Sequence, residues 1–497
     1  MSSDPLLRFR RSAAQLHALA GIERTIRAAD ATSRRKYLRD FNIAFQEYSR
    51  VLQANSVNRR AESADIILVG DYHALPASQL YTASLVEKLS SAGRSVILAV
   101  EAILARDQPV LDEWQRGEIE LEELRSRIRF EADWGYDWQP FSELLRRTKS
   151  VGARIQGIDC VPRQDMRSIR ARDRHAAAKI AGLRASHPGS SVVVLFGESH
   201  LAPNHLPLLI RKLRQCDLVL TILQNIDSLY WVSAGEPQDS VDAVEVSDDV
   251  LCVFSASPLE KYEHYRLCID RWAGQRADRI DLTPSFYNLI MSLLRFLNVD
   301  GDSMHGPIRS SFLVQQLPEI WCAANDEQLH RLLSYRLRRH TTYVSATLRT
   351  EGSCFLPGSN VIVVRDFRMP AAAEQVARSL VCACHPPGAK VPSVEDGFYS
   401  RVLESALGFF GSKILCWNRK LSSVSPLDAR SRCKQIQRIG ESLGCELYAA
   451  YVRGDVSKRW LRSLFFKDVS RSGAARRVYE QVFARVSTPR TALRMVS

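Results

Sequence analysis

The sequence predicts an α/β protein with a parallel-core sheet flanked by helices, followed by a mainly α-helical region. Three observations support this fold class. Short apolar runs alternate with longer segments of helical periodicity over residues 61–270, which is typical of the crossover units of a parallel sheet. The strand signal fades after this region, and amphipathic helical stretches dominate residues 275–497. The 497 residues, 45% of them hydrophobic, suffice for two or three domains with buried cores.

The elements of the α/β region follow one another in the order that crossover units require. Strands are predicted at residues 65–71, 95–102, 153–160, 191–198, 217–224, 228–234 and 248–257. The later strands are expected to be antiparallel at the edge of the sheet. Residues 77–93 have helical leucine spacing and end in a glycine, which predicts the first crossover helix. We therefore expect three parts: a basic helical N-terminal segment (1–60), an α/β domain (61–270) and a basic, mainly α-helical C-terminal region (275–497).

The formal net charge of +13 is concentrated at the two ends of the sequence. Residues 401–497 contain 19 Lys and Arg against 7 Asp and Glu, and residues 1–60 contain 12 against 5, so the middle is net acidic. Basic ends suit an anionic partner such as nucleic acid, a membrane surface or the acidic centre of the chain itself. Arginine-rich helix faces that contact only water have the same composition, and both interpretations stay open.

The compartment is predicted from what the sequence lacks. The N-terminal residues mix basic and apolar side chains without the uninterrupted apolar core of a secretory signal. No run of about 18 apolar residues occurs, so we expect no transmembrane segment. The eleven cysteines have no compact spacing, which favours reduced thiols. We therefore expect a cytoplasmic protein.

Polar side chains follow four of the predicted strands. They are Asp71 and His73 in "IILVGDYHALP", Glu101 in "LAVEA", Asp159 in "GIDC", and Glu198 and His200 in "VVVLFGESHLAP". The carboxyl ends of parallel strands meet at one edge of a sheet, where α/β proteins place their ligands. Each carboxylate alone would also suit a helix N-cap or an arginine partner. Four strand ends with the same character favour one shared polar site.

Two kinds of chemistry fit histidines beside carboxylates. The first is binding of a divalent metal ion such as Mn, Co or Zn, with His73, His200, Glu101 and Asp71 as ligands and an open water position. The second is metal-free general acid–base catalysis, in which a carboxylate orients an imidazole that removes a proton from water or an alcohol. The candidate catalytic residues are His73, Glu101, His200 and Glu198. The sequence does not choose between these chemistries.

Further motifs between the two histidines carry a family resemblance. They are, in order, a strand ending in Glu101, the "QPVLDEW" helix, "GEI", "WGYDW" at residues 134–138, and a strand followed by "VPR". In this order they resemble the ChaN-like haem-binding-uptake family of the Tiki superfamily. The paired Gly-x-x-His elements at 70–73 and 197–200 are similar to a hallmark shared with Tiki proteases and erythromycin esterases. The resemblance covers roughly residues 60–270, about two-fifths of the chain.

The resemblance implies site residues as well as a fold. It makes His73, Glu101 and His200 the leading candidates, with Asp71 and Glu198 at the acidic position of each motif. Asp71 stands where the family usually has glutamate. The better-known members of the family are membrane-attached lipoproteins that bind haem.

Haem binding adds further candidate residues. Tyr72 and Tyr136 are candidate phenolate ligands of a haem iron, although the aromatic residues around Tyr136 also suit ordinary packing. Arg106 and Arg163 are candidates for orienting an anionic substrate or a carboxylate.

Three hypotheses for the function follow. The first is a metal-dependent or acid–base hydrolase of unknown substrate, acting on a small molecule. The second is a protein that binds haem or iron without turnover. The third is an interaction protein whose α/β domain has lost its activity, which the intact acids and histidines of both motifs argue against.

Overall fold

The computed structural model of the chain describes residues 13–29, 36–161, 169–236, 238, 240–274, 281–299, 317–322, 327, 329, 341–384, 393–421 and 432–487. The chain forms two compact units. The α/β unit consists of Arg24–Ser233 and Val241–Gly274, and the helical unit consists of Met1–Glu23, Ala234–Ser240 and Gln275–Ser497. The boundary between the units in the N-terminal part of the chain lies between Glu23 and Arg24. No helix in the described ranges is long and apolar enough to cross a membrane.

The α/β unit is built on a sheet with the strand order β1-β7-β8-β6-β2-β5-β3-β4. The strands are β1 (Arg50–Leu52), β2 (Ile66–Asp71), β3 (Ser95–Leu104), β4 (Arg154–Asp159), β5 (Ser190–Gly197), β6 (Val219–Gln224), β7 (Ala243–Ser247) and β8 (Val250–Val253). Each strand in the run β4-β3-β5-β2-β6-β8 is parallel to its neighbours. At one edge of the sheet, β7 pairs antiparallel with β8, and β1 pairs antiparallel with β7. The predicted parallel core is therefore confirmed, but the expected antiparallel direction of the later strands is wrong, because β8 pairs parallel to β6. The antiparallel strands β7 and β1 were not predicted from the sequence.

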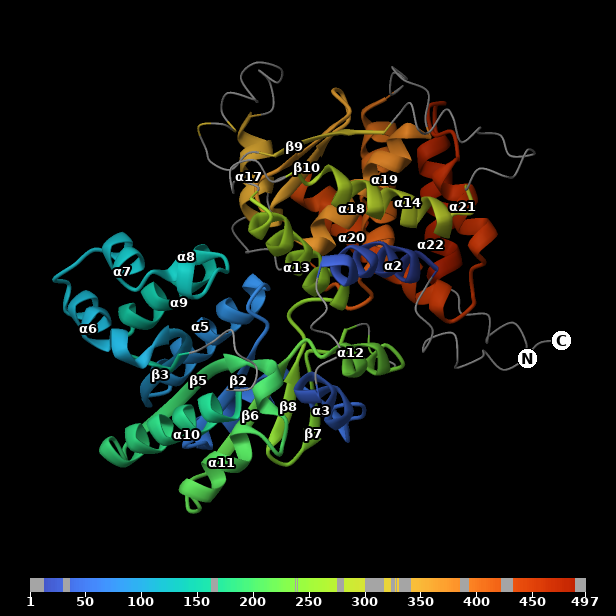
Figure 1. The fold of residues 1–497 in the computed structure, drawn as a ribbon. Coiled ribbons are helices and arrows are strands. Elements are labelled where there is room, and N and C mark those ends of the chain that lie inside the picture. The colour runs from blue at the N-terminus through green and yellow to red at the C-terminus, as the bar shows by residue number, and fades with distance from the viewer. Residues whose placement is uncertain are drawn as a thin grey trace. The chain divides into compact units, whose positions relative to one another are not determined.

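Helices cover both faces of this sheet. They are α3 (Lys36–Ala44), α4 (Ala54–Ser63), α5 (Pro76–Ser91), α6 (Gln108–Arg116), α7 (Leu121–Arg127), α8 (Phe130–Asp133), α9 (Trp138–Ser150), α10 (Ile169–Ser186), α11 (Leu206–Leu213), α12 (Asp227–Ser233) and α13 (Pro258–Trp272). Helices α10 and α11 pack together against β4, β5 and β6, as Figure 1 shows, while α5 and α9 pack on the other face. Because both faces are covered, every residue of β2 and of β5 is buried, and both strands read as continuous apolar runs.

One predicted strand is wrong. Residues 228–234 were expected to be a strand, but Asp227–Ser233 is the helix α12. Asn225 has a φ of 53°, and this left-handed residue turns the chain just after β6. Leu229, Tyr230 and Ser233 are buried at the spacing of one helix face rather than at alternate positions. The apolar run "SLYWV" was too short for its period to be recognised.

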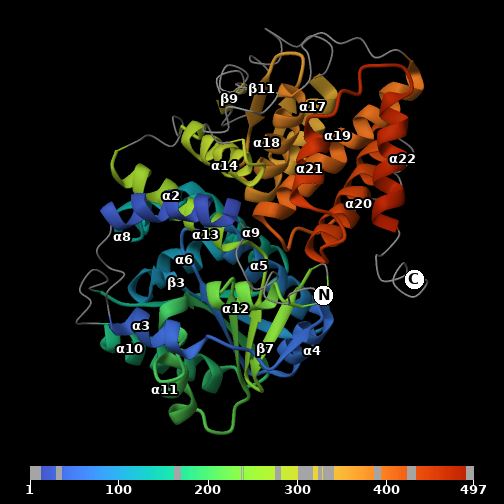
Figure 2. The same ribbon diagram turned by 90° about the vertical axis from the view of Figure 1, so that its right-hand side faces the viewer.

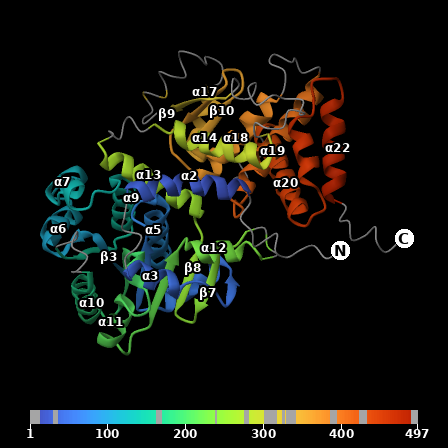
Figure 3. The same cartoon turned by 45° about the vertical axis from the view of Figure 1, so that its right-hand side comes forward.

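The helical unit is mainly α-helical, as the sequence predicted. Its helices are α2 (Ala13–Ala29, with residues up to Glu23 in this unit), α14 (Thr283–Phe296), α17 (Thr341–Glu351), α18 (Met369–Ala383), α19 (Val394–Leu415), α20 (Arg432–Val452), α21 (Lys458–Phe465) and α22 (Ala474–Ser487). Helix α19 lies between α18, α20 and α22 (Figures 2 and 3). Gly440 and Gly444 of α20 permit this close packing, because a Cβ atom on either would lie 2.4 Å from an atom of α19.

A small sheet in the helical unit was missed by the sequence reasoning. It has the order β10-β11-β9, with β9 (Glu319–Cys322), β10 (Ser353–Leu356) and β11 (Val361–Val364). Strands β10 and β11 form an antiparallel hairpin around "PGSN", and β9 pairs parallel to β11. The turn residues between two apolar runs were a usable hairpin signal.

Candidate functional site

The ends of three adjacent strands bring the candidate residues together. Strand β2 pairs with β5 so that Asp71 lies opposite Gly197, and β5 pairs with β3 on its other side. The two Gly-x-x-His motifs therefore leave the sheet next to each other, with Glu101 of β3 beside them. The expectation that these strand ends share one edge of the sheet is met by the geometry.

His73 is held by Asp71. The His73 Nδ1 atom lies 2.9 Å from Asp71 Oδ2, and the other carboxylate oxygen of Asp71 accepts a hydrogen bond from Gln79 Nε2 at 2.5 Å. Asp71 is buried, whereas the side chain of His73 remains 22% exposed. A carboxylate on Nδ1 fixes the tautomer that carries its proton there, so Nε2 is the nitrogen available to accept a proton.

His200 is held in the same way by a residue far away in the sequence. Its Nδ1 atom lies 2.5 Å from Oδ1 of Asp173, which belongs to α10. The second oxygen of Asp173 accepts a hydrogen bond from the hydroxyl of Tyr37 in α3. Both His200 and Asp173 are buried. The sequence reasoning found His200 but not the carboxylate that orients it.

Glu101 lies between the two imidazoles. Its Oε2 atom is 4.0 Å from His73 Nε2, and its Oε1 atom is 3.9 Å from His200 Nε2. Glu101 Oε1 accepts a hydrogen bond from Arg172 at 2.5 Å, and Oε2 accepts the backbone N–H of Gly197 at 2.5 Å. The separations from the histidines exceed hydrogen-bond length. Both Nε2 atoms therefore face a carboxylate without being bonded to it.

Gly197 is required for this close arrangement. A Cβ atom at residue 197 would lie 3.2 Å from Glu101 Oε2 and 3.2 Å from His73 Nε2. Both of these neighbours are fixed by other contacts, so neither moves away freely. The glycine of the second motif thus lets β5 pass directly beneath the histidine of the first motif.

The electrostatics of the site follow from these contacts. Burial alone would raise the pKa of Glu101, but the charges of His73 and Arg172 outweigh it and lower this pKa to about 2. Burial alone would lower the pKa of His73, but the adjacent Asp71 carboxylate outweighs it and raises this pKa above its ordinary value. Burial raises the pKa of Asp71, and the charge of His73 opposes this shift. The site thus combines a firmly ionised carboxylate with an imidazole of increased basicity.

A pocket of about 600 Å³ opens next to His73. His73 and Asp71 line it, together with Tyr72, Tyr136 and Glu198, whereas Glu101 and His200 lie behind its wall. It is also lined by Asp227 of α12 and by Lys261, Tyr262 and Tyr265 of α13. His73 is therefore the histidine of the pair that a ligand in this pocket contacts.

Glu198 plays a different part from the one its motif suggested. Both of its carboxylate oxygens accept hydrogen bonds from Lys261 Nζ, at 3.0 and 3.2 Å. Burial raises the pKa of Glu198, and the charge of Lys261 opposes this shift. Glu198 lines the pocket as one half of an ion pair, and Glu101 is the carboxylate that faces both histidines.

The predicted metal-ligand set is not supported by the side-chain arrangement. The two carboxylate oxygens of Asp71 contact His73 and Gln79. Both oxygens of Glu101 accept hydrogen bonds, one of them from the guanidinium group of Arg172. Within the described ranges, no group of three or more His, Cys, Asp and Glu side chains is placed to hold a metal ion. The described residues therefore give no support to the metal site that was expected from His73, His200, Glu101 and Asp71.

Arg106, one of the two predicted substrate-orienting arginines, does not line the pocket. Arg106 is 55% exposed and pairs with Asp133 at 3.2 Å, so it forms a surface ion pair. Arg163 lies outside the described residues. Arg172 of α10 supplies the cation of the site instead, binding Glu101 and also Asp159, the third strand-end carboxylate, at 2.8 Å. No motif in the sequence marked Arg172, because it lies within an ordinary basic helix.

Tyr72 and Tyr136 both line the pocket, as candidate ligands should. Burial raises the pKa of each phenol, and Glu198 adds to this effect at Tyr72. Both residues therefore stay candidates for contact with a ligand in this pocket.

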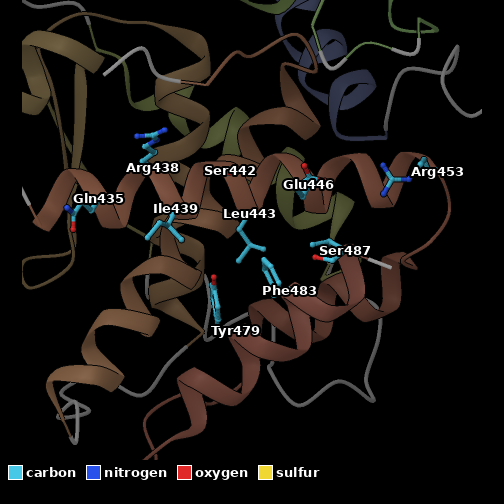
Figure 4. A pocket seen from close by; sticks show the side chains of 11 residues that line it. Gln435, Arg438, Ile439, Ser442, Leu443, Glu446, Arg453, Tyr479, Phe483 and Ser487 are labelled. Carbon is cyan, nitrogen blue, oxygen red and sulfur yellow. The ribbon is translucent and has the colours of Figure 1, made fainter. Parts of the chain in front are cut away.

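A second cavity, of about 940 Å³, lies in the helical unit between α20 and α22. Figure 4 shows Ile439, Leu443 and Phe483 lining it, with Arg438 and Glu446 among the polar residues. It contains no histidine and no cysteine among its lining residues. The pocket of the α/β unit, with its oriented imidazole, is therefore the candidate functional site.

The fold and the site together define an α/β protein with a histidine–carboxylate site at the ends of its central strands. Residues 57–179 match the model of the family described as haem-binding uptake, Tiki superfamily, ChaN, and this confirms the resemblance seen in the sequence. The match includes Asp71, His73, Glu101 and Asp173 but ends before the second Gly-x-x-His motif.

Two further comparisons give less information. A solved structure of ChaN of Campylobacter jejuni, described as showing cofacial haem binding, is similar over 40% of this chain and 91% of its own, with 16% identity and a TM-score of 0.31. At that TM-score the likeness supports no inference about the present site. No curated protein matches the sequence.

Proposed function

We propose that the α/β unit is a hydrolase that works by metal-independent acid–base catalysis on a small molecule. The observation that carries this proposal is the His73–Asp71 pair: Asp71 holds Nδ1 of His73, and His73 lines the pocket with its Nε2 atom 4.0 Å from Glu101 Oε2. The Asp71 carboxylate raises the pKa of His73, which makes its imidazole a stronger base. The cytoplasm remains the expected compartment.

Each residue has a defined role in this proposal. His73 Nε2 takes a proton from a water molecule as the water oxygen attacks the substrate, and then returns the proton to the leaving group. Asp71 keeps the proton on Nδ1 and stabilises the imidazolium. Arg172 and the Gly197 N–H hold Glu101 in its ionised form, and Glu101 stabilises positive charge on either imidazole. His200 is a positioning residue, because it is buried behind the pocket.

The proposal is tested with p-nitrophenyl acetate as the probe, before and after treatment with EDTA. We expect hydrolysis above the buffer rate that EDTA leaves unchanged and that His73→Ala lowers about a hundredfold or more. His187→Ala is the matched control, because His187 lies in the same unit but not in the pocket. Hydrolysis that is absent, or that His73→Ala and His187→Ala affect equally, would contradict the proposal.

Haem binding is the second candidate function, and the family match favours it. His73 fits an axial ligand of the iron, because a ligating imidazole commonly donates its other ring N–H to a carboxylate. The pocket fits the propionates of haem less well. Apart from His73, Lys261 is the cationic side chain among the described residues that line it, and Lys261 is already paired with Glu198.

A haem titration separates the two candidates. If haem is the ligand, a Soret band grows to one equivalent and is lost in His73→Ala but retained in His187→Ala. If the pocket is catalytic and binds no haem, the spectrum equals that of haem with an unrelated protein. In that case the p-nitrophenyl acetate assay alone decides the function.

A further inference from the structure

The pocket beside His73 carries more negative than positive charge. Lys261 Nζ lies 3.0 Å from Glu198 Oε1 and 3.6 Å from Asp227 Oδ1, so one ammonium group serves two carboxylates. The remaining charged groups on the pocket wall, Asp71 and His73, neutralise each other at most. Lys261 is buried, and the two carboxylates raise its pKa despite its burial. The charged groups of the pocket therefore sum to an excess of at least one negative charge.

One carboxylate oxygen in this pocket lacks a hydrogen bond. Asp227 Oδ2 accepts the hydroxyl of Tyr262, whereas Asp227 Oδ1 is buried and has no hydrogen-bond partner among the described residues. Its contact with Lys261, at 3.6 Å, is an ion pair that is too long for a hydrogen bond. A buried carboxylate oxygen without a donor is costly unless a ligand supplies one. A ligand with an N–H group would meet this need.

Aromatic side chains also line this pocket. The rings of Tyr72 and Tyr265 have centroids 6.0 Å apart, and Tyr265 in turn contacts Trp272 at 6.0 Å. Tyr136 contacts Trp272 at 5.4 Å and the imidazole of His73 at 5.1 Å. The faces of such rings attract cations. Tyr72 already shows this behaviour, because Lys261 Nζ lies 4.6 Å from its ring centroid.

We propose that the pocket recognises a ligand through a protonated amine, which Asp227 and the tyrosine rings bind. The amine donates a hydrogen bond to Asp227 Oδ1, and its positive charge cancels the excess negative charge of the Glu198–Lys261–Asp227 group. A ligand anchored in this way extends through the same cavity to His73, which also lines it. This inference names the substrate class of the proposed hydrolase and rests on that function only for the reaction, since amine binding itself requires no catalysis.

The test compares benzylamine with its neutral analogue benzyl alcohol by isothermal titration calorimetry on the full-length protein. We expect benzylamine to bind at least about tenfold more tightly than benzyl alcohol, because only the amine supplies a charged donor. Asp227→Asn should weaken benzylamine binding about tenfold or more and leave benzyl alcohol unchanged. Glu122→Gln is the matched control, since Glu122 is a 72% exposed carboxylate on α7, outside the pocket.

A second variant tests the proposal independently of whether Asp227→Asn folds correctly. Tyr265→Leu removes an aromatic face but no charge, and it should also weaken benzylamine binding while the circular dichroism spectrum stays unchanged. Equal affinity for benzylamine and benzyl alcohol, no benzylamine binding, or an unchanged affinity in folded Asp227→Asn would each overturn the proposal.

The failure of amine recognition is distinguishable from the failure of the proposed hydrolase. His73→Ala should abolish hydrolysis of p-nitrophenyl acetate and still bind benzylamine, since His73 does not anchor the amine. Tight benzylamine binding without any hydrolysis would support amine recognition and contradict the proposed catalysis. Hydrolysis without preference for the amine removes amine recognition alone.

Discussion

Asp173 Oδ1 lies 2.5 Å from His200 Nδ1, and both residues are buried. His200 follows the carboxyl end of the central strand β5. Asp71 and His73 make the same kind of contact at 2.9 Å. The two histidines come from equivalent strand ends, but the two carboxylates do not, since Asp173 lies on helix α10. Each carboxylate holds Nδ1, and as a result both Nε2 atoms face Glu101 across about 4 Å.

The basicity of His73 should depend on Asp71. The pKa of His73 is raised because the Asp71 carboxylate stabilises the imidazolium, so Asp71→Asn should lower it. A general base works in its neutral form, and the rate should therefore rise as pH increases through the His73 pKa. In Asp71→Asn this rise should move to lower pH. Histidine NMR titrations of both proteins measure the shift, and an unchanged His73 pKa would show that Asp71 does not control it.

Glu101 should stabilise the fold in a pH-dependent way. Its pKa falls from the usual 4.5 to about 2 in the folded protein, so its contribution to stability is fully present above pH 4.5 and is lost as pH falls toward 2. Glu101→Gln should cost about 3 kcal/mol of unfolding free energy at pH 7, because Arg172 loses a buried partner. Urea unfolding at pH 7 and at low pH tests this. A cost that is the same at both pH values argues against an ionised Glu101.

Gly197→Ala should disturb the site without unfolding the protein. The added Cβ atom would crowd Glu101 Oε2 and His73 Nε2 at 3.2 Å, so the His73 ring must shift. We expect the p-nitrophenyl acetate rate to fall about tenfold, since small displacements of a catalytic group are costly. Gly182→Ala on α10 is the control, because a Cβ there meets nothing within 4 Å. A rate loss in both variants would point to a general effect on folding.

The basic C-terminal region should bind an anionic partner in a salt-dependent way. Residues 401–497 carry 19 basic against 7 acidic residues, and the attraction of such a surface is screened as salt increases. Binding is measured by co-sedimentation with phosphatidylserine vesicles and by gel shifts with nucleic acid. Both assays are done at low salt and at 0.5 M salt, where the Debye length is about 4 Å. If neither ligand binds at low salt, the basic residues serve only to contact water.

The strand-end residues of the site could be predicted because their positions follow from the pattern of the chain. An apolar run fixes a strand, parallel strands share an edge, and so Asp71, Glu101 and Glu198 had to lie near one another. The tertiary pairing then decided their roles. Glu198 turns to Lys261, whereas Glu101 turns to the histidines, and a strand pattern does not contain this difference.

The residues that complete the site could not be predicted because their helices have no distinctive spacing. Arg172 and Asp173 belong to α10, in a sequence rich in arginine, and Lys261 belongs to α13. Their side chains reach the site through tertiary contacts, with Arg172 bound to Glu101 and Lys261 bound to Glu198. The hydrogen bond from Arg172 to Glu101 was missed for the same reason.

The claim that the two histidines act as one unit around Glu101 is tested most directly by a double-mutant cycle. The measurement is the rate of p-nitrophenyl acetate hydrolysis by the wild-type protein, His73→Ala, His200→Ala and the double variant. We predict that each single variant loses about a hundredfold in rate and that the double variant loses little more, because residues that act together are strongly non-additive. Losses that multiply in the double variant, or a His200→Ala rate equal to that of the wild type, would contradict the claim.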